Sequence, residues 1–306
     1  MRVLAADIGA SNARFAIAET GAAPPRRLFE RTYPTAQHPG FEAALGAFLA
    51  ELRAAHGEAL APERAAIAVA GPVRAGQAQL PNLPSWTIAR PAIEAWLGLE
   101  ARVLNDFEAL ARGLAQASPA DWIELQAGEP QPQANIALVG AGTGLGVAAL
   151  VWDGRRHRPL ATEAGHMSFA PQDEAQDALL RSLRARHGRV SAERVLSGPG
   201  IAAIHELLEG APAEPAAASA RALDLFVACY GAFAGDVALA FLARGGLYVC
   251  GGIAARRAAR LAQGDFISWF CAKGRHRALA AAIPVRLVVN EKLGLAGAAL
   301  AAAAQD

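Results

Sequence analysis

The sequence predicts an α/β protein built from two related halves, and three observations support this. Its 306 residues suffice for one large domain or two modest ones. Strand-like and helix-like patterns occur in both halves, which favours layered α/β architecture. Two segments, 3–18 and 135–152, share a plan of strand, small-residue turn and strand, roughly half a chain apart.

The first half begins with the hairpin that this plan describes. An apolar run over 3–6 leads into the turn 7–12, and a second run covers 13–18. The expected elements that follow are a helix over 41–55, a strand over 65–70, a helix over 91–97 that begins at a proline, a strand over 102–104 and a helix from 107.

The second half repeats the hairpin and then becomes mainly helical. The turn 140–146 separates apolar runs over 135–139 and 147–151. The expected helices are 174–186, 192–196, 201–208, 221–242 and 294–304, and the expected late strands are 247–250 and 285–289. Residues 211–216 indicate a loop insertion.

One uncharged stretch, 134–152, is long enough to cross a bilayer as a helix. Alternating glycines at its centre argue against that interpretation, because glycine weakens a helix interior and suits a tight turn. The acid Asp7 also comes too early for the apolar core of a signal peptide, so export is not expected. We expect no membrane partner and a cytoplasmic protein.

The net charge and the cysteine content speak against further classes of protein. Lys+Arg 29 against Asp+Glu 28 gives a net charge of +1, which speaks against a nucleic-acid partner. Cys229, Cys250 and Cys271 form no CxxC pair and lie in apolar surroundings. Neither a disulfide framework nor a cysteine metal site is expected, and a reducing compartment fits best.

The turn 140–146 does not match the common nucleotide motifs. A GxGxxG pattern fails at Leu145 or at Val147, depending on where it starts, and a Walker motif fails because the chain has no Gly-Lys dipeptide. A turn of this kind can still bring backbone N–H groups to a phosphate, here Gly142 to Gly144 with the Thr143 hydroxyl.

The first turn offers the same groups at Gly9, Ala10, Ser11 and Asn12, and Asp7 adds a carboxylate able to serve Mg²⁺ directly or through water. Two phosphate-type turns suggest a nucleoside triphosphate held between two lobes. The alternative is that both are ordinary hairpin turns without a ligand.

Asn105 and Asp106 stand where a strand ends and a helix begins, a place where α/β proteins present ligand-binding residues. Asp106 can accept a proton from a hydroxyl nucleophile, as phosphoryl transfer to an alcohol requires. It can equally be a helix N-cap.

Three further polar residues lie among small or apolar neighbours: Glu163, His166 and Glu193. With Asn105 and Asp106 they form a set suited to a polyhydroxyl ligand. Glu193 can instead be a first-turn helix acid, and His166 a satisfied half-buried histidine.

At these residues the chain resembles bacterial ATP-dependent glucokinases. The matching segments keep their order along the chain, and they are 7–14, 104–107, 140–146, 163–171, 191–200 and 251–253. The resemblance implies a two-lobed, actin-like or hexokinase-type ATPase fold with an inter-lobe cleft. We expect a small lobe from 1–108 plus 293–306 and a large lobe from 109–292.

The resemblance also implies the site and the reaction, ATP-dependent phosphorylation of the glucose 6-hydroxyl, the first step of glycolysis. Glucose hydroxyls would bind Asn105, Asp106, Glu163, His166 and Glu193, with Asp106 as the catalytic base. Asp7 would serve Mg²⁺ through water, and the two turns would meet the ATP phosphates. Gly251 and Gly252 would line the adenosine site. Family members are typically cytoplasmic homodimers.

The chain departs from the family pattern in three places. Ala10-Ser11 stands where Gly-Thr is usual, which keeps a small residue and a hydroxyl. The run 81–86 differs from the usual Thr-Asn-His-x-Trp, so a sugar contact is not carried over to Asn82. Residues 167–177 contain no cysteine, unlike the zinc site of the related repressor-type sugar kinases, so no structural zinc is expected.

Two alternative functions stay open at this point. The chain could phosphorylate another hexose, such as fructose, mannose or an N-acetyl sugar, because loop shape decides the substrate. It could also be a sugar-sensing protein without catalysis. The presence of Asp106 and the expected lack of a DNA-binding segment before residue 3 speak against the sensor.

Overall fold

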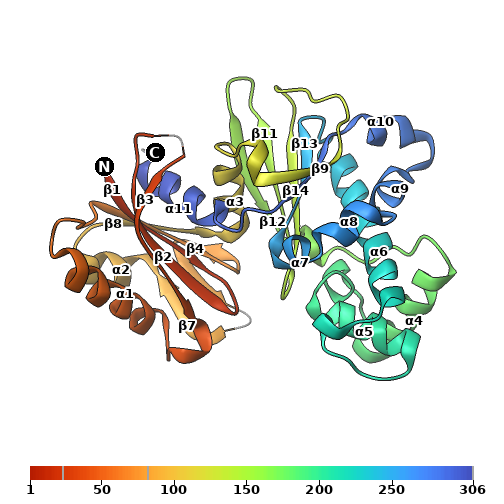
Figure 1. Cartoon of the computed structure of the whole chain (residues 1–306), viewed down its shortest axis with the longest axis horizontal. Coiled ribbons are helices and arrows are strands. Elements are labelled where there is room, and N and C mark those ends of the chain that lie inside the picture. The colour runs from red at the N-terminus through yellow and green to blue at the C-terminus, as the bar shows by residue number, and fades with distance from the viewer. Residues whose placement is uncertain (23, 81–82, 305–306) are drawn as a thin grey trace. The chain divides into compact units, whose positions relative to one another are not determined.

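The computed structural model describes residues 1–22, 24–80 and 83–304. The chain divides into two compact units, Met1–Ser118 with Lys292–Asp306, and Pro119–Glu291. The first boundary falls after Ser118, where the sequence suggested 108. Helix α3 (Asp106–Leu114) stays with the first unit because it packs against α11 (Leu293–Ala303). Figure 1 shows the elements of each unit.

A five-stranded sheet forms the centre of the first unit, in the order β3-β2-β1-β4-β8. Its strands are β1 (Arg2–Ile8), β2 (Asn12–Glu19), β3 (Arg26–Pro34), β4 (Arg64–Val69) and β8 (Glu100–Asn105). The first three form an antiparallel meander, whereas β4 is parallel to β1 and β8 to β4. Ile8 pairs with Val69, and Val69 with Asn105, so the three parallel strands end at one edge.

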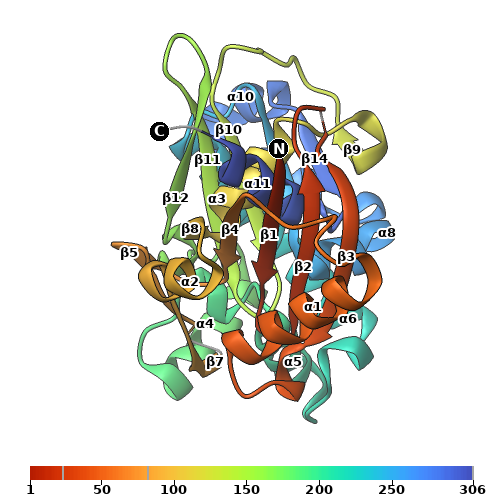
Figure 2. The same ribbon diagram turned by 90° about the vertical axis from the view of Figure 1, so that its left-hand side faces the viewer.

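Helices cover both faces of this sheet (Figure 2): α1 (Phe41–His56) and α2 (Arg90–Leu97) on one, α3 and α11 on the other. Leu4 and Ile8 pack into the core under α1, whereas Val3 and Ala5 pack with α11. A strand covered on both faces needs consecutive apolar residues, which explains the unbroken apolar run at its start.

Smaller elements complete the first unit. A three-stranded sheet has the order β5-β6-β7. Its strands are β5 (Val73–Arg74), β6 (Gln77–Leu80) and β7 (Leu83–Ala89). A short 3-10 helix, η1 (Thr35–Gln37), follows β3 and lies beside the first turn.

The second unit has a six-stranded sheet in the order β12-β11-β10-β13-β14-β9. Its strands are β9 (Trp122–Gln126), β10 (Ile136–Ala141), β11 (Leu145–Trp152), β12 (His157–Thr162), β13 (Gly246–Cys250) and β14 (Val285–Val288). An antiparallel meander is again followed by two parallel strands, and β9 adds an antiparallel edge. The shared order confirms the common plan that the two hairpins indicated.

Helices pack around this second sheet. The α-helices are α4 (Glu174–His187), α5 (Gly198–Glu209), α6 (Ala220–Ala240), α7 (Gly251–Arg256), α8 (Ala258–Gln263), α9 (Phe266–Cys271) and α10 (Arg277–Ala282). The 3-10 helices are η2 (Pro119–Asp121), η3 (Ala164–His166), η4 (Ala192–Arg194), η5 (Pro215–Ala217) and η6 (Gly274–His276). The expected helix 192–196 is therefore a single 3-10 turn.

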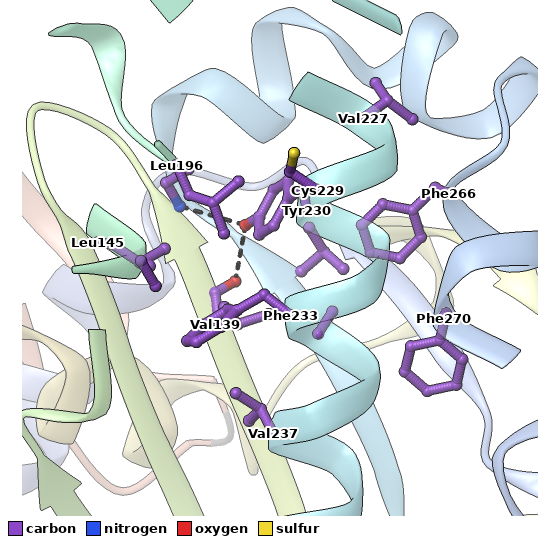
Figure 3. Packing of buried hydrophobic residues seen from close by; sticks show 14 of the residues in the cluster. Val139, Leu145, Leu196, Val227, Cys229, Tyr230, Phe233, Val237, Phe266 and Phe270 are labelled. Carbon is purple, nitrogen blue, oxygen red and sulfur yellow. Dashed lines mark hydrogen bonds between the residues drawn. The ribbon is translucent and has the colours of Figure 1, made fainter. Parts of the chain in front are cut away.

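Helix α6 is the main core helix of the second unit. It lies between β10 and α9, and the centre of its Tyr230 ring lies 5.6 Å from that of Phe226. The Phe266 ring, 5.5 Å away, lies on the α9 side of Tyr230 (Figure 3). It is also the one helix of the described chain that is long and apolar enough to cross a membrane, but 72% of its apolar window is buried inside the protein. The stretch 134–152, by contrast, is the hairpin that its glycines predicted.

Candidate active site

The first turn joins β1 to β2 and is fixed from outside by a buried threonine. The Gly9 N–H donates to the Asn12 carbonyl at 2.9 Å. The Thr35 hydroxyl donates to the Ala10 carbonyl at 2.6 Å, and its N–H donates to the Ser11 carbonyl at 3.1 Å. Thr35 is only 2% exposed, so its polar groups serve to hold the turn in shape. No local pattern in the sequence singles out Thr35.

Asp7 lies at the end of β1, beside Arg14 and the start of α11. Arg14 Nη1 is 3.6 Å from Asp7 Oδ2, and the Asp7 side chain is 16% exposed. A Cβ added to Gly294 would lie 3.4 Å from the same oxygen, so the carboxylate sits near the positive end of α11.

This single carboxylate fits a magnesium ion that arrives with ATP. Mg²⁺ is commonly held by one or two carboxylates, with phosphate and water oxygens as its other ligands. No cluster of three or more potential metal-ligating side chains occurs among the described residues. The donor set therefore suits an ion held mainly by the nucleotide, with Asp7 as its protein partner.

Asn105, rather than Asp106, is the N-cap of α3. Asn105 Oδ1 accepts from the N–H groups of Phe107 at 2.9 Å and Glu108 at 3.3 Å, and its Nδ2 donates to the Gly71 carbonyl at 3.1 Å. Asp106 is the first residue of the helix, and its Oδ1 also accepts from Phe107 N–H, at 3.0 Å. The N-cap interpretation of Asp106 is wrong. Its carboxylate lies in the first helical turn, where the helix dipole favours negative charge.

These residues of the first unit meet at one edge of its sheet. Asp7 lies near the end of β1 and the first turn follows it, whereas Asn105 ends β8 and Asp106 follows it, with β4 between the two strands. At the usual strand spacing of about 4.8 Å, the two groups are separated by roughly 10 Å across the sheet. The carboxyl ends of parallel strands are the usual ligand-binding edge of an open α/β sheet.

The second turn lies at the N-terminus of α5. The Gly142 N–H donates to the Gly144 carbonyl at 2.8 Å, and the Gly198 N–H donates to the Gly142 carbonyl at 2.9 Å. Ser197 caps this helix through its side chain, and Thr143 is exposed at the tip of the turn. Backbone N–H groups and a helix N-terminus thus lie together, an arrangement suited to phosphate.

Glu193 contacts this turn directly. Its Oε2 accepts from the Leu145 N–H at 2.9 Å, and a Cβ added to Gly144 would lie 2.5 Å from that oxygen. Glu193 does stand in the first turn of η4, but its hydrogen bond goes to β11 rather than to its own helix. A Cβ added to Gly165 would lie 2.0 Å from the Leu145 carbonyl, so η3 also packs against this end of β11.

Glu163 directly precedes η3, and His166 is its last residue. The His166 N–H donates to the Glu163 carbonyl at 2.9 Å, and Arg189 Nη2 donates to the His166 carbonyl at 2.6 Å. Both side chains are exposed, and neither has a hydrogen-bond partner within the described part of the chain. His166 is therefore not the half-buried, satisfied histidine that the sequence left open.

Gly251 and Gly252 lie next to the second turn. Gly251 has φ 88°, a conformation that other residues rarely adopt, and its added Cβ would lie 2.5 Å from the Ala141 carbonyl. The backbone of α7 can approach the end of β10 only because residue 251 is glycine. Arg256 lies beside Gly252, with Nη1 3.0 Å from an added Cβ there.

The sites expected from sequence thus form two groups, one in each unit. The first unit contains Asp7, 9–12, Asn105 and Asp106, and the second contains 142–144, Glu163, His166, Glu193, Gly251 and Gly252. Asn82 lies outside the described residues.

Two residues that contact the turns were not predicted from the sequence, Thr35 and Tyr230. The Tyr230 hydroxyl contacts the strand before the second turn. A tyrosine within the apolar run of α6 was the available signal, since a buried hydroxyl needs a partner.

The cysteines take no part in these groups. All three are free and buried. Burial raises the pKa of the Cys229, Cys250 and Cys271 thiols, which keeps them neutral. Thiolate chemistry is therefore not expected in this protein.

Known proteins match the chain over nearly its whole length. The family model described as Glucokinase covers residues 4–305. A glucokinase of Caulobacter sp. strain K31 is 36% identical over 97% of this chain and 94% of that protein. A glucokinase of Chromobacterium violaceum is 38% identical over 97% of this chain and 88% of that protein.

Solved structures agree in fold. A glucokinase from an Antarctic psychrotroph has a TM-score of 0.83 and 32% identity, and the match covers 99% of this chain and 98% of that one. A ROK family glucokinase from Streptomyces griseus, in complex with glucose and AMPPNP, has a TM-score of 0.63 and 21% identity over 99% of each chain. The fold is the actin-like, hexokinase-type fold of sugar kinases. The chain belongs to the glucokinase family, the enzymes that phosphorylate glucose with ATP.

Proposed function

We propose that this enzyme transfers the γ-phosphoryl group of ATP to the 6-hydroxyl of glucose with Asp106 as the general base. The observation that carries the assignment is the division of roles at the end of β8, where Asn105 caps α3 and Asp106 follows it. Asn105 therefore holds the N-cap position, and the Asp106 carboxylate stands in the first turn of α3 at this edge of the sheet. A carboxylate at this edge can accept the proton of the attacking hydroxyl.

The residues proposed to bind the sugar offer polar groups suited to its hydroxyls. One hydrogen of the Asn105 side-chain amide is donated to the Gly71 carbonyl, and the second can be donated to a sugar hydroxyl. Glu163 and His166 expose polar groups that no described residue satisfies. Glu193 binds a sugar hydroxyl while it also accepts from the Leu145 N–H. A carboxylate has several lone-pair sites, so both contacts are possible at once.

The phosphates bind to backbone N–H groups of the two turns. Residues 9–12 line one cradle and 142–144 line the other, with the Thr143 hydroxyl at its tip. The N–H groups of Gly9 and Gly142 donate within their own turns, so the other N–H groups of the turns would contact the phosphates. Gly251 and Gly252 line the adenosine site beside the second turn. AMPPNP in the Streptomyces griseus structure supports a nucleotide role for this fold.

Asp7 would hold Mg²⁺ through water. The ion, when bound with ATP, supplies positive charge that neutralises the transferred phosphoryl group. Arg14 and the start of α11 place positive charge beside the Asp7 carboxylate.

We infer the cellular setting from the family resemblance. The enzyme acts in the cytoplasm as a homodimer and supplies glucose 6-phosphate to glycolysis. The buried, unpaired cysteines are compatible with a reducing compartment. Light scattering of the purified enzyme tests the dimer, and a native mass equal to that of one chain would contradict it.

The variant Asp106→Asn tests the general base. It keeps the size of the side chain but cannot take up the hydroxyl proton, so turnover should fall by about a hundredfold or more. Glucose and Mg-ATP are varied in a coupled assay that measures ADP release, and circular dichroism checks the fold.

Glu108→Gln is the matched control, because Glu108 lies in the same helical turn and pairs with Arg112 at 3.0 Å. It should keep near-normal turnover. If Asp106→Asn is folded and retains more than about a tenth of the turnover, Asp106 is not the base.

A further inference from the structure

A buried hydroxyl lies against the strand that leads into the second turn. Tyr230 is 0% exposed in the middle of α6. Its hydroxyl donates to the Val139 carbonyl at 3.1 Å and accepts from the Ala141 N–H at 3.2 Å (Figure 3). The two backbone groups flank Gly140, and the next residue along the chain is Gly142 of the turn. The hydroxyl therefore bridges the last residues of β10.

Packing alone does not explain a tyrosine here. The ring is held by Phe226 and Phe266, and phenylalanine would make the same contacts. Burying a hydroxyl is costly unless it forms hydrogen bonds, and both of its bonds go to the end of β10. Burial also raises the pKa of Tyr230, so the hydroxyl stays protonated and able to donate.

The end of β10 loses its partner strand on one side. The parallel ladder with β13 ends at the pair Gly140–Cys250, because the chain then turns into α7, whereas the antiparallel ladder with β11 continues to Ala141–Leu145. Beyond Ala141 the Gly142 N–H donates to the Gly144 carbonyl, the Gly198 N–H to the Gly142 carbonyl and the Leu145 N–H to Glu193. The two hydrogen bonds of the Tyr230 hydroxyl hold the end of β10, the strand that leads into the turn.

We propose that the Tyr230 hydroxyl is a positioning group for the phosphate-binding turn 142–144, so that its removal weakens ATP binding much more than glucose binding. The inference rests on the proposed phosphate role of this turn. Tyr230 touches no substrate in this proposal. It acts through Val139 and Ala141, whose positions set the direction of the N–H groups that follow.

The variant Tyr230→Phe tests this directly. It keeps the ring and removes only the hydroxyl. We expect KM for ATP to rise about three- to tenfold, with KM for glucose changed less than about twofold. Amide hydrogen exchange of peptides covering 139–146 should become faster. A merely structural role would lower thermal stability or active fraction without separating the two KM values.

Tyr248→Phe is the matched control. Tyr248 lies in the same sheet and is almost as buried, but its hydroxyl accepts from Arg286 Nη1 at 2.7 Å, away from the turn. It should change neither KM for ATP nor exchange over 139–146. An equal effect in both variants would mean a general loss of stability and would overturn the proposal.

Thr143→Val separates this proposal from the one on which it rests. If Thr143→Val raises KM for ATP while Tyr230→Phe changes neither that value nor the exchange, the positioning role of Tyr230 is wrong and the phosphate role of the turn stands. If Tyr230→Phe speeds exchange and neither variant changes KM for ATP, the turn does not bind phosphate, and both proposals are overturned.

Discussion

Glu193, one of the residues proposed to bind the sugar, also contacts the second turn through its side chain. Its Oε2 accepts from the Leu145 N–H at 2.9 Å and fills the space beside Gly144. Substitutions at Glu193 can remove the negative charge while keeping the oxygen that accepts from the Leu145 N–H, or remove both. Glutamine keeps a carbonyl oxygen for Leu145 but loses the charge, whereas alanine loses both.

We expect Glu193→Gln to raise KM for glucose by about tenfold and to leave KM for ATP within about twofold, because the turn keeps its acceptor. Glu193→Ala should raise both constants, since Leu145 then lacks its partner. Steady-state kinetics with each substrate varied in turn measures the split. Equal KM values for ATP in the two variants would show that the Leu145 contact does not support the turn.

Single residues were predictable from sequence where a residue type implies its chemistry. Asp106 was predicted as an acid at a strand end, but whether it caps α3 depended on Asn105 Oδ1, and a sequence does not show which of two neighbours caps a helix. Thr35 was missed because its contacts, to Ala10 and Ser11, form only after β3 folds back along β2. Such long-range contacts have no local pattern.

At the scale of elements, close helix packing depends on glycines without room for a side chain. In the α3–α11 pair, a Cβ added to Gly297 would lie 1.7 Å from the Ala109 carbonyl, and one added to Gly113 would lie 2.0 Å from the Leu293 carbonyl. Each is a backbone contact, so relief requires the helices to move apart. This pair also places the start of α11 beside Asp7.

Gly297→Ala should therefore lower the free energy of unfolding by about 1–3 kcal/mol or more, the usual cost of overpacking. Gly46→Ala is the control, because this glycine lies inside α1 and the nearest atom to an added Cβ is in the Trp96 ring at 3.8 Å. That variant should gain about 0.5–1 kcal/mol from helix propensity. Urea unfolding measures the free energy of unfolding of both variants. If both variants were destabilised equally, the packing argument would be wrong.

Elements with a buried, periodic pattern were predictable, and exposed ones were not. α1 and α6 begin and end within two residues of the expected bounds. The edge strands β3 and β12 were missed: β3 carries Arg26, Arg27, Glu30 and Arg31, and β12 contains Pro159. Edge strands are half solvated and often carry charges or proline, so their hydrophobic signal is weak. The short helices α7 to α10 lack a full amphipathic period.

At the scale of the whole molecule, the repeated hairpins predicted two related halves, because both hairpins depend on a local turn between apolar strands, and the two sheets share the same order of their first five strands. The boundaries between the two units were harder to predict from the sequence. Residues after Lys292 return to the first unit through α11, and the boundary after Ser118 depends on how α3 packs against it. Packing between segments far apart in sequence leaves only a faint trace in either segment.

The charge of the molecule leads to a prediction about salt. The net charge is +1, and the residues assigned to the phosphates include no lysine or arginine. If backbone N–H groups and Mg²⁺ hold the nucleotide, long-range attraction contributes little. Between about 0.05 and 0.3 M NaCl, kcat/KM for Mg-ATP should fall by less than about threefold.

The uncharged substrate glucose serves as the internal control, because its kcat/KM reports any general effect of salt on the enzyme. Both values come from the same coupled assay at each salt concentration. A fall in the ATP value of tenfold or more, with the glucose value unchanged, would mean that side-chain cations hold the phosphates. Arg256, beside Gly252, would then be the first residue to replace, since its guanidinium already lies at the proposed adenosine site.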